Sequence, residues 1–177
     1  MTVSTEQSRW DRLYEMAASQ QGLFTTRQAA DAGYSLPLLA HHTKHGRILR
    51  VDRGVYRLVH FPQGDLEDHV QAWLWTEQAG GFSHESALAL HEHSDVLPTS
   101  LEITVPSSWK QRRLRIPDGV LLRYSELADD EIVSLGPIPV SSPARTLNDC
   151  ALQGTSPEIL QVASQQALSR GLVILSE

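Results

Sequence analysis

The first hydrophobic pattern in the chain is helical. Apolar side chains recur at three- and four-residue spacing between residues 10 and 18, and Gly22 follows as a typical helix stop. We therefore predict a first helix that ends before Gly22. Two shorter helices should follow, because Thr25 and Ser35 are good N-cap residues and each is followed, at a short helical length, by a glycine.

The pattern changes from helical to alternating after Gly46. Apolar and basic side chains alternate over residues 48–51 and 55–58, on either side of the sequence Asp52-Arg53-Gly54. This predicts a β-hairpin whose turn uses the positive φ that glycine accepts. Two short helices joined by a glycine turn and followed by a hairpin are typical of a winged helix-turn-helix.

A different pattern begins after the linker at residues 60–64. Asp65 is expected to cap a helix that Gly80 ends, and Ser83 to start a short one. Strands are predicted at residues 101–105, 120–124, 132–135 and 138–140, and helices after Ser142-Pro143 and Ser156-Pro157. The predicted fold class is α+β: a winged helix-turn-helix domain at residues 1–60, then a mixed α/β C-terminal domain at residues 61–177.

Charge is divided unevenly between these two parts. The chain has a net charge of −6, yet residues 22–58 hold six Lys and Arg against two Asp, a net charge of +4. Residues 59–177 hold seven basic and sixteen acidic residues, a net charge of −9. A basic module joined to an acidic one is compatible with binding to double-stranded DNA through the module.

The candidate DNA contacts lie in the second short helix, in the hairpin and beside them. Lysine and arginine bind phosphates and bases, and histidine and serine form further hydrogen bonds with DNA. The second helix holds few cations, so we expect the hairpin to supply much of the binding. The predicted DNA-binding residues are Arg27, Ser35, His41, Lys44, His45, Arg47, Arg50, Arg53 and Arg57.

Other function classes have little support in the sequence. No apolar stretch is long enough to span a membrane, and the polar N-terminus has no signal-peptide core, so a cytoplasmic location is expected. The single cysteine, Cys150, excludes an intramolecular disulfide. We predict no enzyme activity, no cofactor and no metal, although His84, Glu85 and His91 form a cluster that could serve a nucleic-acid-processing enzyme.

Three separated motifs resemble those of the AbiEi-type antitoxins of type IV toxin–antitoxin systems. In the N-terminal part the resemblance lies in Gly33-Tyr34-Ser35, Gly46 and Arg53-Gly54-Val55-Tyr56-Arg57. In the C-terminal part it lies in Ser83-His84-Glu85-Ser86-Ala87, Ile103-Thr104-Val105-Pro106, and Ser142 to Leu147 with Asp149. Relatives often carry arginine-rich recognition helices, and this chain departs from them there.

The resemblance implies a repressor that binds inverted repeats in its own operator, acting as a homodimer or cooperative pair. It also implies that the C-terminal domain is an antitoxin or interaction domain that counters a nucleotidyltransferase-like toxin. An alternative is a stand-alone winged-helix transcription factor whose C-terminal domain senses a ligand or dimerises. Because the sequence ends abruptly after its last predicted helix, we also expect a natural C-terminal extension to be missing.

Overall fold

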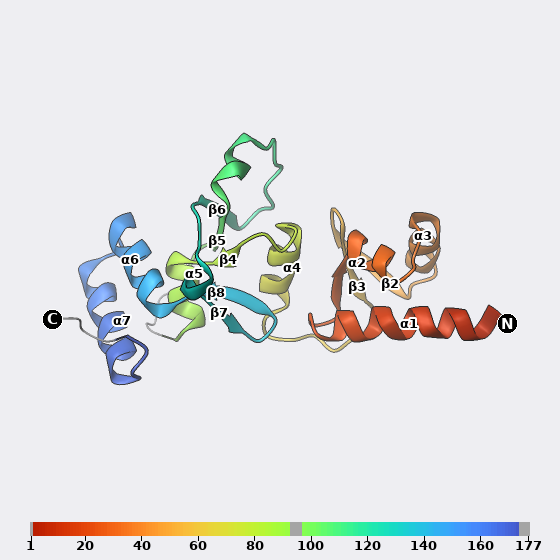
Figure 1. Cartoon of the computed structure of the whole chain (residues 1–177), viewed down its shortest axis with the longest axis horizontal. Helices are drawn as coiled ribbons and strands as arrows, with labels where there is room; N and C mark the ends of the chain where they lie inside the picture. The colour runs from red at the N-terminus through yellow and green to blue at the C-terminus, as the bar shows by residue number, and fades with distance from the viewer. Residues whose placement is uncertain (1, 93–96, 174–177) are drawn as a thin grey trace. The chain divides into compact units, whose positions relative to one another are not determined.

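The computed structural model describes residues 2–92 and 97–173, with the backbone alone for residues 2–6. The predicted α+β class is confirmed, since helices and two separate β-sheets occur in the chain. Residues 1–78 and 79–177 form two compact units, called unit 1 and unit 2 below. Figure 1 labels their helices and strands.

Unit 1 combines helices with a three-stranded antiparallel sheet. The strand order is β1-β3-β2, so the last strand of the hairpin lies in the middle. The elements are α1 (Thr2–Ala18), β1 (Leu23–Thr25), α2 (Thr26–Asp31), α3 (Leu36–Lys44), β2 (Ile48–Asp52), β3 (Val55–Leu58) and α4 (Glu67–Trp75).

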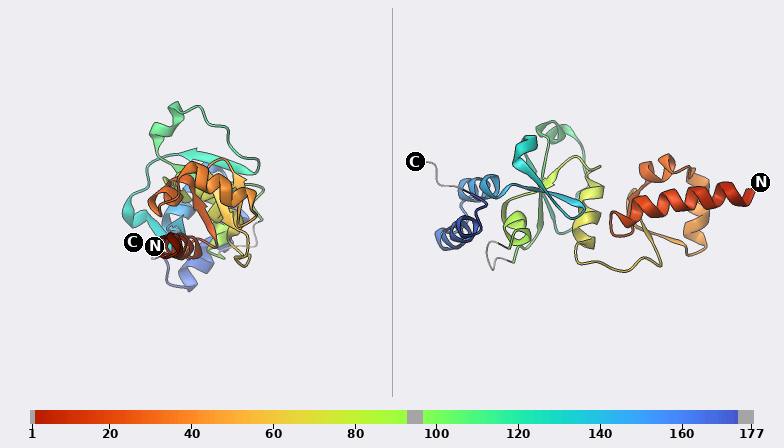
Figure 2. Two further views of the ribbon diagram at one scale, coloured as in Figure 1. Left: turned by 90° about the vertical axis from the view of Figure 1, so that its right-hand side faces the viewer. Right: turned by 60° about the horizontal axis from the view of Figure 1, so that its bottom comes forward.

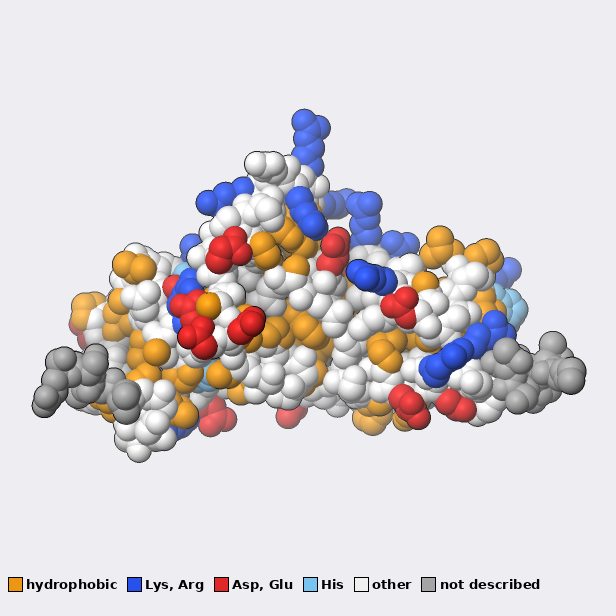
Figure 3. Space-filling view, viewed as in Figure 1, with side chains coloured by type: hydrophobic (Ala, Val, Ile, Leu, Met, Phe, Trp, Pro, Cys, Tyr) orange, Lys and Arg blue, Asp and Glu red, His pale blue; other side chains and the backbone are white. Residues whose placement is uncertain are grey.

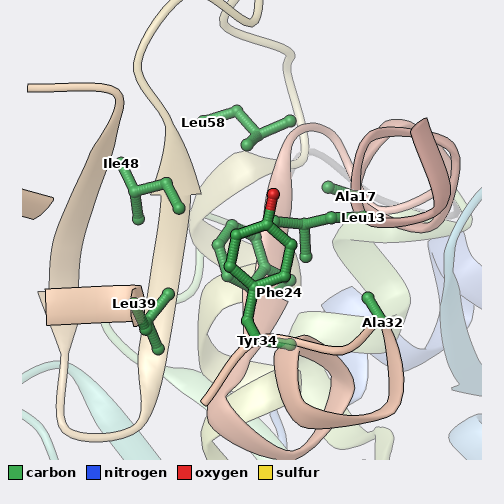
Figure 4. Close-up of a cluster of buried hydrophobic side chains, with 9 residues drawn as sticks. Leu13, Ala17, Phe24, Ala32, Tyr34, Leu39, Ile48 and Leu58 are labelled. Atoms are coloured by element: carbon green, nitrogen blue, oxygen red, sulfur yellow. The ribbon is translucent and has the colours of Figure 1, made fainter. Parts of the chain in front are cut away.

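The core of unit 1 joins its helices to its sheet. Phe24 of β1 is fully buried and stacks on Tyr56 of β3 with ring centroids 5.8 Å apart. Figure 4 shows the side chains that surround Phe24. They come from α1, from the turn after α2, from α3 and from the sheet: Leu13, Ala17, Ala32, Tyr34, Leu39, Ile48 and Leu58.

The predicted N-caps of α2 and α3 are confirmed. Thr25 accepts a hydrogen bond from the Gln28 amide, and Gln28 returns one to the Thr25 amide, which completes a capping box. Ser35 accepts a bond from the Leu38 amide at the start of α3. The hairpin turn is confirmed as well, because Gly54 has a φ of +79° between β2 and β3.

The predicted cap at Asp65 is wrong, and α4 belongs to the N-terminal unit. The helix starts at Glu67 with Leu66 at the N-cap position, and no side chain caps it. α4 packs on β1 and β3. Unit 1 therefore continues to Gln78, whereas the predicted domain ends at residue 60.

Unit 2 is built on a five-stranded mixed sheet with the order β6-β5-β4-β8-β7. β4 pairs antiparallel with β5 and parallel with β8, β5 pairs parallel with β6, and β7 with β8 forms a hairpin. The strands are β4 (Gly81–Phe82), β5 (Leu101–Val105), β6 (Val120–Tyr124), β7 (Ile132–Leu135) and β8 (Ile138–Ser141). The four predicted strands are thus confirmed, whereas β4 falls where the sequence predicted a helix stop.

Helices cover this sheet and pack on one another. α5 (His84–Leu90) contacts β5, β8 and α6 (Pro143–Gln153), and α6 contacts α7 (Pro157–Ser169). Figures 1 and 2 agree that α6 and α7 lie side by side. Leu88, Cys150 and Ala163 form the buried contact among the three helices. The short 3-10 helices η1 (Ser107–Gln111) and η2 (Asp129–Glu131) connect the strands.

Candidate nucleic-acid interface

The helix α3 presents a polar outer side and an apolar inner side. Leu39 and His42 are buried, while His41, Lys44 and His45 are exposed. His42 packs on Tyr34 with ring centroids 5.5 Å apart, so its ring belongs to the core of unit 1. Ser35, at the N-terminus of the helix, is exposed but already accepts the Leu38 amide.

His41 and His45 lie on one face of α3, as their four-residue spacing predicts. Their ring centroids are 4.0 Å apart, and His45 Nδ1 lies 2.7 Å from the His41 carbonyl oxygen, to which it donates. This bond fixes the orientation of the His45 ring. The Nε2 atom of His45 is left as the ring nitrogen that can meet a partner outside the helix.

The start of α2 lies against the hairpin turn. The Thr26 amide donates to the Gly54 carbonyl oxygen over 2.9 Å, and the Thr26 hydroxyl donates to the same oxygen over 3.4 Å. Arg27 and Arg53 are the exposed neighbours of these two residues, so two distant parts of the sequence bring cations to one place. Arg50 is exposed on β2 and donates through Nε to the Asp52 carbonyl oxygen over 3.3 Å.

A second group of cations lies where α3 passes into β2. The Arg47 amide donates to the His42 carbonyl oxygen over 3.1 Å, which continues the hydrogen bonding of the helix end towards the strand. Lys44, His45 and Arg47 are all exposed there. Within the described part of the chain, no carboxylate forms an ion pair with Arg27, Lys44, Arg47, Arg50 or Arg53.

Arg57 is different from the other predicted DNA contacts. Its Nε lies 2.8 Å from Glu67 Oε1, and its Nη atoms donate to the carbonyl oxygens of Leu58 and Phe61. Its side chain is only 14% exposed. We correct the prediction for Arg57: the guanidinium fastens β3 to the start of α4, and its hydrogen-bonding capacity is used within unit 1.

The histidine and glutamate cluster of unit 2 does not converge on one point. Glu85 accepts from the Thr155 hydroxyl, and His91 Nε2 donates to the Ser141 carbonyl oxygen over 2.7 Å. His84 Nδ1 lies 2.9 Å from Ser83 Oγ and 3.8 Å from a carboxylate oxygen of Glu102. Among residues 2–92 and 97–173, no three His, Cys, Asp or Glu side chains form a metal-binding group. His93 lies outside the described residues.

Two networks of charged side chains in unit 2 were not predicted. Glu102 is buried in the middle of β5 and pairs with Arg123 of β6 over 3.1 Å. Arg145 pairs with Glu131 over 2.6 Å and with Asp149 over 2.9 Å. Asp149 lies four residues after Arg145 on α6, whereas Glu131 comes from a distant part of the sequence.

Burial and hydrogen bonding shift the pKa values of several groups in unit 2. Burial lowers the pKa of His84, and neighbouring Asp149 and Glu102 oppose this only in part. Burial also lowers the pKa of His91, against the effect of its bond to Ser141. A hydrogen bond from the Ala128 amide, aided by Arg145, lowers the pKa of Glu131.

The segment between β5 and β6 carries a second basic patch. Arg112 lies over the ring of buried Trp109, with its guanidinium carbon 3.9 Å from the ring centroid. Lys110, Arg113 and Arg115 are exposed in the same segment. Figure 3 shows blue side chains gathered at the top of the view, where Figure 1 draws this segment.

Part of unit 1 matches a known protein family. Residues 11–59 match a family described as a transcriptional regulator, AbiEi antitoxin. The match extends from α1 to just beyond β3, and therefore includes α2, α3 and the hairpin.

A solved structure is similar over much of the chain. It is the crystal structure of the RV2827C protein from Mycobacterium tuberculosis, at 16% sequence identity and a TM-score of 0.45. The similarity covers 92% of this chain and 77% of that one. Comparison with curated proteins gives no significant match. Within the described residues, no helix has the length and apolar content needed to cross a membrane.

The resemblance that the N-terminal motifs indicated is thus confirmed as a family match over residues 11–59.

Proposed function

We propose that unit 1 is a winged helix-turn-helix domain that binds double-stranded DNA. In this proposal α2 and α3 are the helix pair, α3 lies in the major groove, and the β2–β3 hairpin is the wing. The observation that carries it is the family match to residues 11–59, which coincides with the segment that holds the exposed cations. The proposed contacts are Arg27, Ser35, His41, Lys44, His45, Arg47, Arg50 and Arg53.

The charges favour strong contact with phosphates and modest contact with bases. Arg27, Arg50 and Arg53 belong to α2 and the hairpin, where arginine suits the DNA backbone. α3 offers Lys44 and two exposed histidines for the groove, without the arginine that most often contacts guanine. We therefore expect the hairpin to supply much of the affinity and α3 a weaker discrimination among sequences.

The biological role that follows is repression of the chain's own operon as the antitoxin of a type IV pair. The domain assignment is then unit 1 for DNA and unit 2 for interaction with a nucleotidyltransferase-like toxin. A homodimer or cooperative pair on inverted repeats would match the symmetry of such an operator. The family match supports a regulator or antitoxin, and these finer assignments are our proposal.

DNA upstream of the chain's own coding region provides the direct test. We expect the full chain to bind this DNA more tightly than an unrelated duplex of equal length and composition, measured by gel shift in the same salt. Equal binding to both duplexes would mean that the chain binds DNA without sequence preference, and would overturn the operator proposal.

The antitoxin role is tested separately. We expect a reading frame for a nucleotidyltransferase-like protein beside the gene, and growth arrest on its expression that this chain relieves. Arrest that persists when both proteins are produced would contradict the antitoxin role without affecting DNA binding.

The leading alternative is a stand-alone transcription factor controlled by a ligand or by dimerisation. If no such neighbouring frame exists and upstream DNA is still bound, this alternative is favoured.

A further inference from the structure

Unit 1 contains an open pocket that the DNA-binding proposal does not use. Its volume is about 480 Å³, within the range of small-molecule sites in proteins. Its walls come from α1, the turn before α3, α3, the residue before β2, the end of β3 and the segment after β3. The lining residues are Gln7, Trp10, Tyr14, Tyr34, His42, Arg47, Leu58, His60 and Phe61.

The walls of the pocket are mainly aromatic. Tyr14 and Phe61 lie 6.1 Å apart between ring centroids, and the rings of Trp10 and His42 lie 6.3 Å apart. Tyr14 is 45% exposed, which leaves part of its ring for a bound molecule to cover. Aromatic rings stack on or pack edge to face against another planar ring, so these walls suit a flat aromatic ligand.

The pocket also carries a positive charge and no negative one. Arg47 is exposed and lines it, and none of the nine lining residues is acidic. Within the described residues, no carboxylate pairs with Arg47. A planar guanidinium with free donors matches a carboxylate in a two-point hydrogen-bonded pair. The side chains of Gln7 and His60 supply further polar groups at the same pocket.

We propose that this pocket binds a small planar aromatic carboxylate, with its ring against the aromatic walls and its carboxylate on Arg47. The binding is independent of any DNA function. Its consequence for regulation rests on the proposed function, because Arg47 is also a proposed phosphate contact. His42, on the buried side of α3, lines the same pocket. A bound carboxylate withdraws Arg47 from DNA and so weakens operator binding.

Calorimetric titration of the full chain with 1-naphthoate tests the binding itself. The expected result is saturable binding to one site, weakened by Arg47→Gln roughly tenfold, as the loss of a charge-assisted pair implies. Arg50→Gln is the matched control, since it removes the same charge from an exposed site outside the pocket, and it should leave the affinity within about twofold. The neutral 1-naphthamide should bind the unmodified chain and the Arg47→Gln chain equally.

A wall variant separates ring recognition from charge recognition. Tyr14→Ala should weaken both naphthalene compounds, because Tyr14 lines the pocket without bearing charge. Circular dichroism and a thermal melt confirm that each variant is folded. No saturable binding of 1-naphthoate, or equal binding to the Arg47→Gln variant, overturns the proposed pocket.

The regulatory consequence has its own measurement. Saturating 1-naphthoate should weaken the binding of upstream DNA by the unmodified chain and have little effect on the Arg47→Gln variant. An unchanged DNA affinity at saturation overturns the regulatory part and leaves the pocket established. If the unmodified chain binds 1-naphthoate and does not bind upstream DNA, the proposed function fails and the carboxylate site stands.

Discussion

Arg57 Nε lies 2.8 Å from Glu67 Oε1, in an ion pair whose side chains are 14% and 13% exposed. The pair connects the central strand of the unit 1 sheet to the first turn of α4. A second bond joins Arg57 Nη2 to Glu67 Oε2 over 3.4 Å, so the guanidinium and the carboxylate meet at two points. An arginine in the motif of the proposed DNA-binding segment therefore has a structural role.

Removal of this pair should destabilise unit 1 without removing a DNA contact. Glu67→Gln leaves the Arg57 charge largely buried and without its partner, which should lower the free energy of unfolding by about 2 kcal/mol. Urea unfolding measures this change. Asp65→Asn is the control, because Asp65 is exposed just before the helix and should have little effect.

The same variants show whether Arg57 has only a structural role or also contacts DNA. The folded Glu67→Gln chain should bind upstream DNA as the unmodified chain does. Much tighter binding by Glu67→Gln would mean that Arg57, once released from Glu67, is a phosphate contact after all.

The Cys150 thiol should be inert in the folded chain. It is fully buried between α5, α6 and α7, and burial raises its pKa to about 12. At pH 8 the reactive thiolate is then roughly one part in ten thousand. Treatment with 4,4′-dithiodipyridine should modify the chain only after unfolding in urea. Rapid stoichiometric reaction in native buffer would show that unit 2 opens around this residue.

Unit 2 should lose stability in mildly acidic solution. The pKa values of His84 and His91 are lowered by burial in the folded chain. The unfolded chain therefore takes up protons first as the pH falls below about 6.5, and this uptake favours unfolding. The urea midpoint of unit 2, followed by the reaction of Cys150, should be lower at pH 5.5 than at pH 7.5.

A single substitution should reduce this acid sensitivity. In His91→Gln the side chain keeps a donor for the Ser141 carbonyl oxygen and cannot take up a proton. The difference between the urea midpoints at the two pH values should therefore be smaller in this variant. His60→Gln is the control, since His60 is exposed in unit 1 and should leave the change intact. A midpoint that rises on acidification would refute the linkage to buried histidines.

The sequence predicted local structure correctly at several positions where one side chain decides the outcome, although not at Asp65. Thr25, Ser35 and Ser142 cap helices because each hydroxyl oxygen accepts a hydrogen bond from the backbone amide three residues ahead. Gly54 turns the hairpin because only a residue without a side chain adopts its positive φ at little cost. Gly22 is required in a further way, because a Cβ there would collide with the ring of Phe61.

Pairings between distant segments could not be predicted in this way. β4 has only two residues, and its hydrogen bonds are with β5 and β8, so its own sequence carries almost no strand pattern. Arg57 alternates with apolar residues as the other hairpin arginines do. It differs from them because α4 brings Glu67 to its guanidinium. Glu102 is buried on β5, and its partner Arg123 comes from β6, which the local sequence of β5 does not indicate.

The salt dependence of DNA affinity, compared between the full chain and the Arg50→Gln/Arg53→Gln variant, tests whether the β2–β3 hairpin binds DNA. We expect the affinity for upstream DNA to fall steeply with salt, and the slope of its logarithm against the logarithm of salt concentration to shrink by about two in the variant. Lys110→Gln/Arg113→Gln, an equal loss of charge in unit 2, should leave that slope unchanged. Equal slopes for the unmodified chain and the hairpin variant would contradict the assignment of the β2–β3 hairpin as the DNA-binding wing.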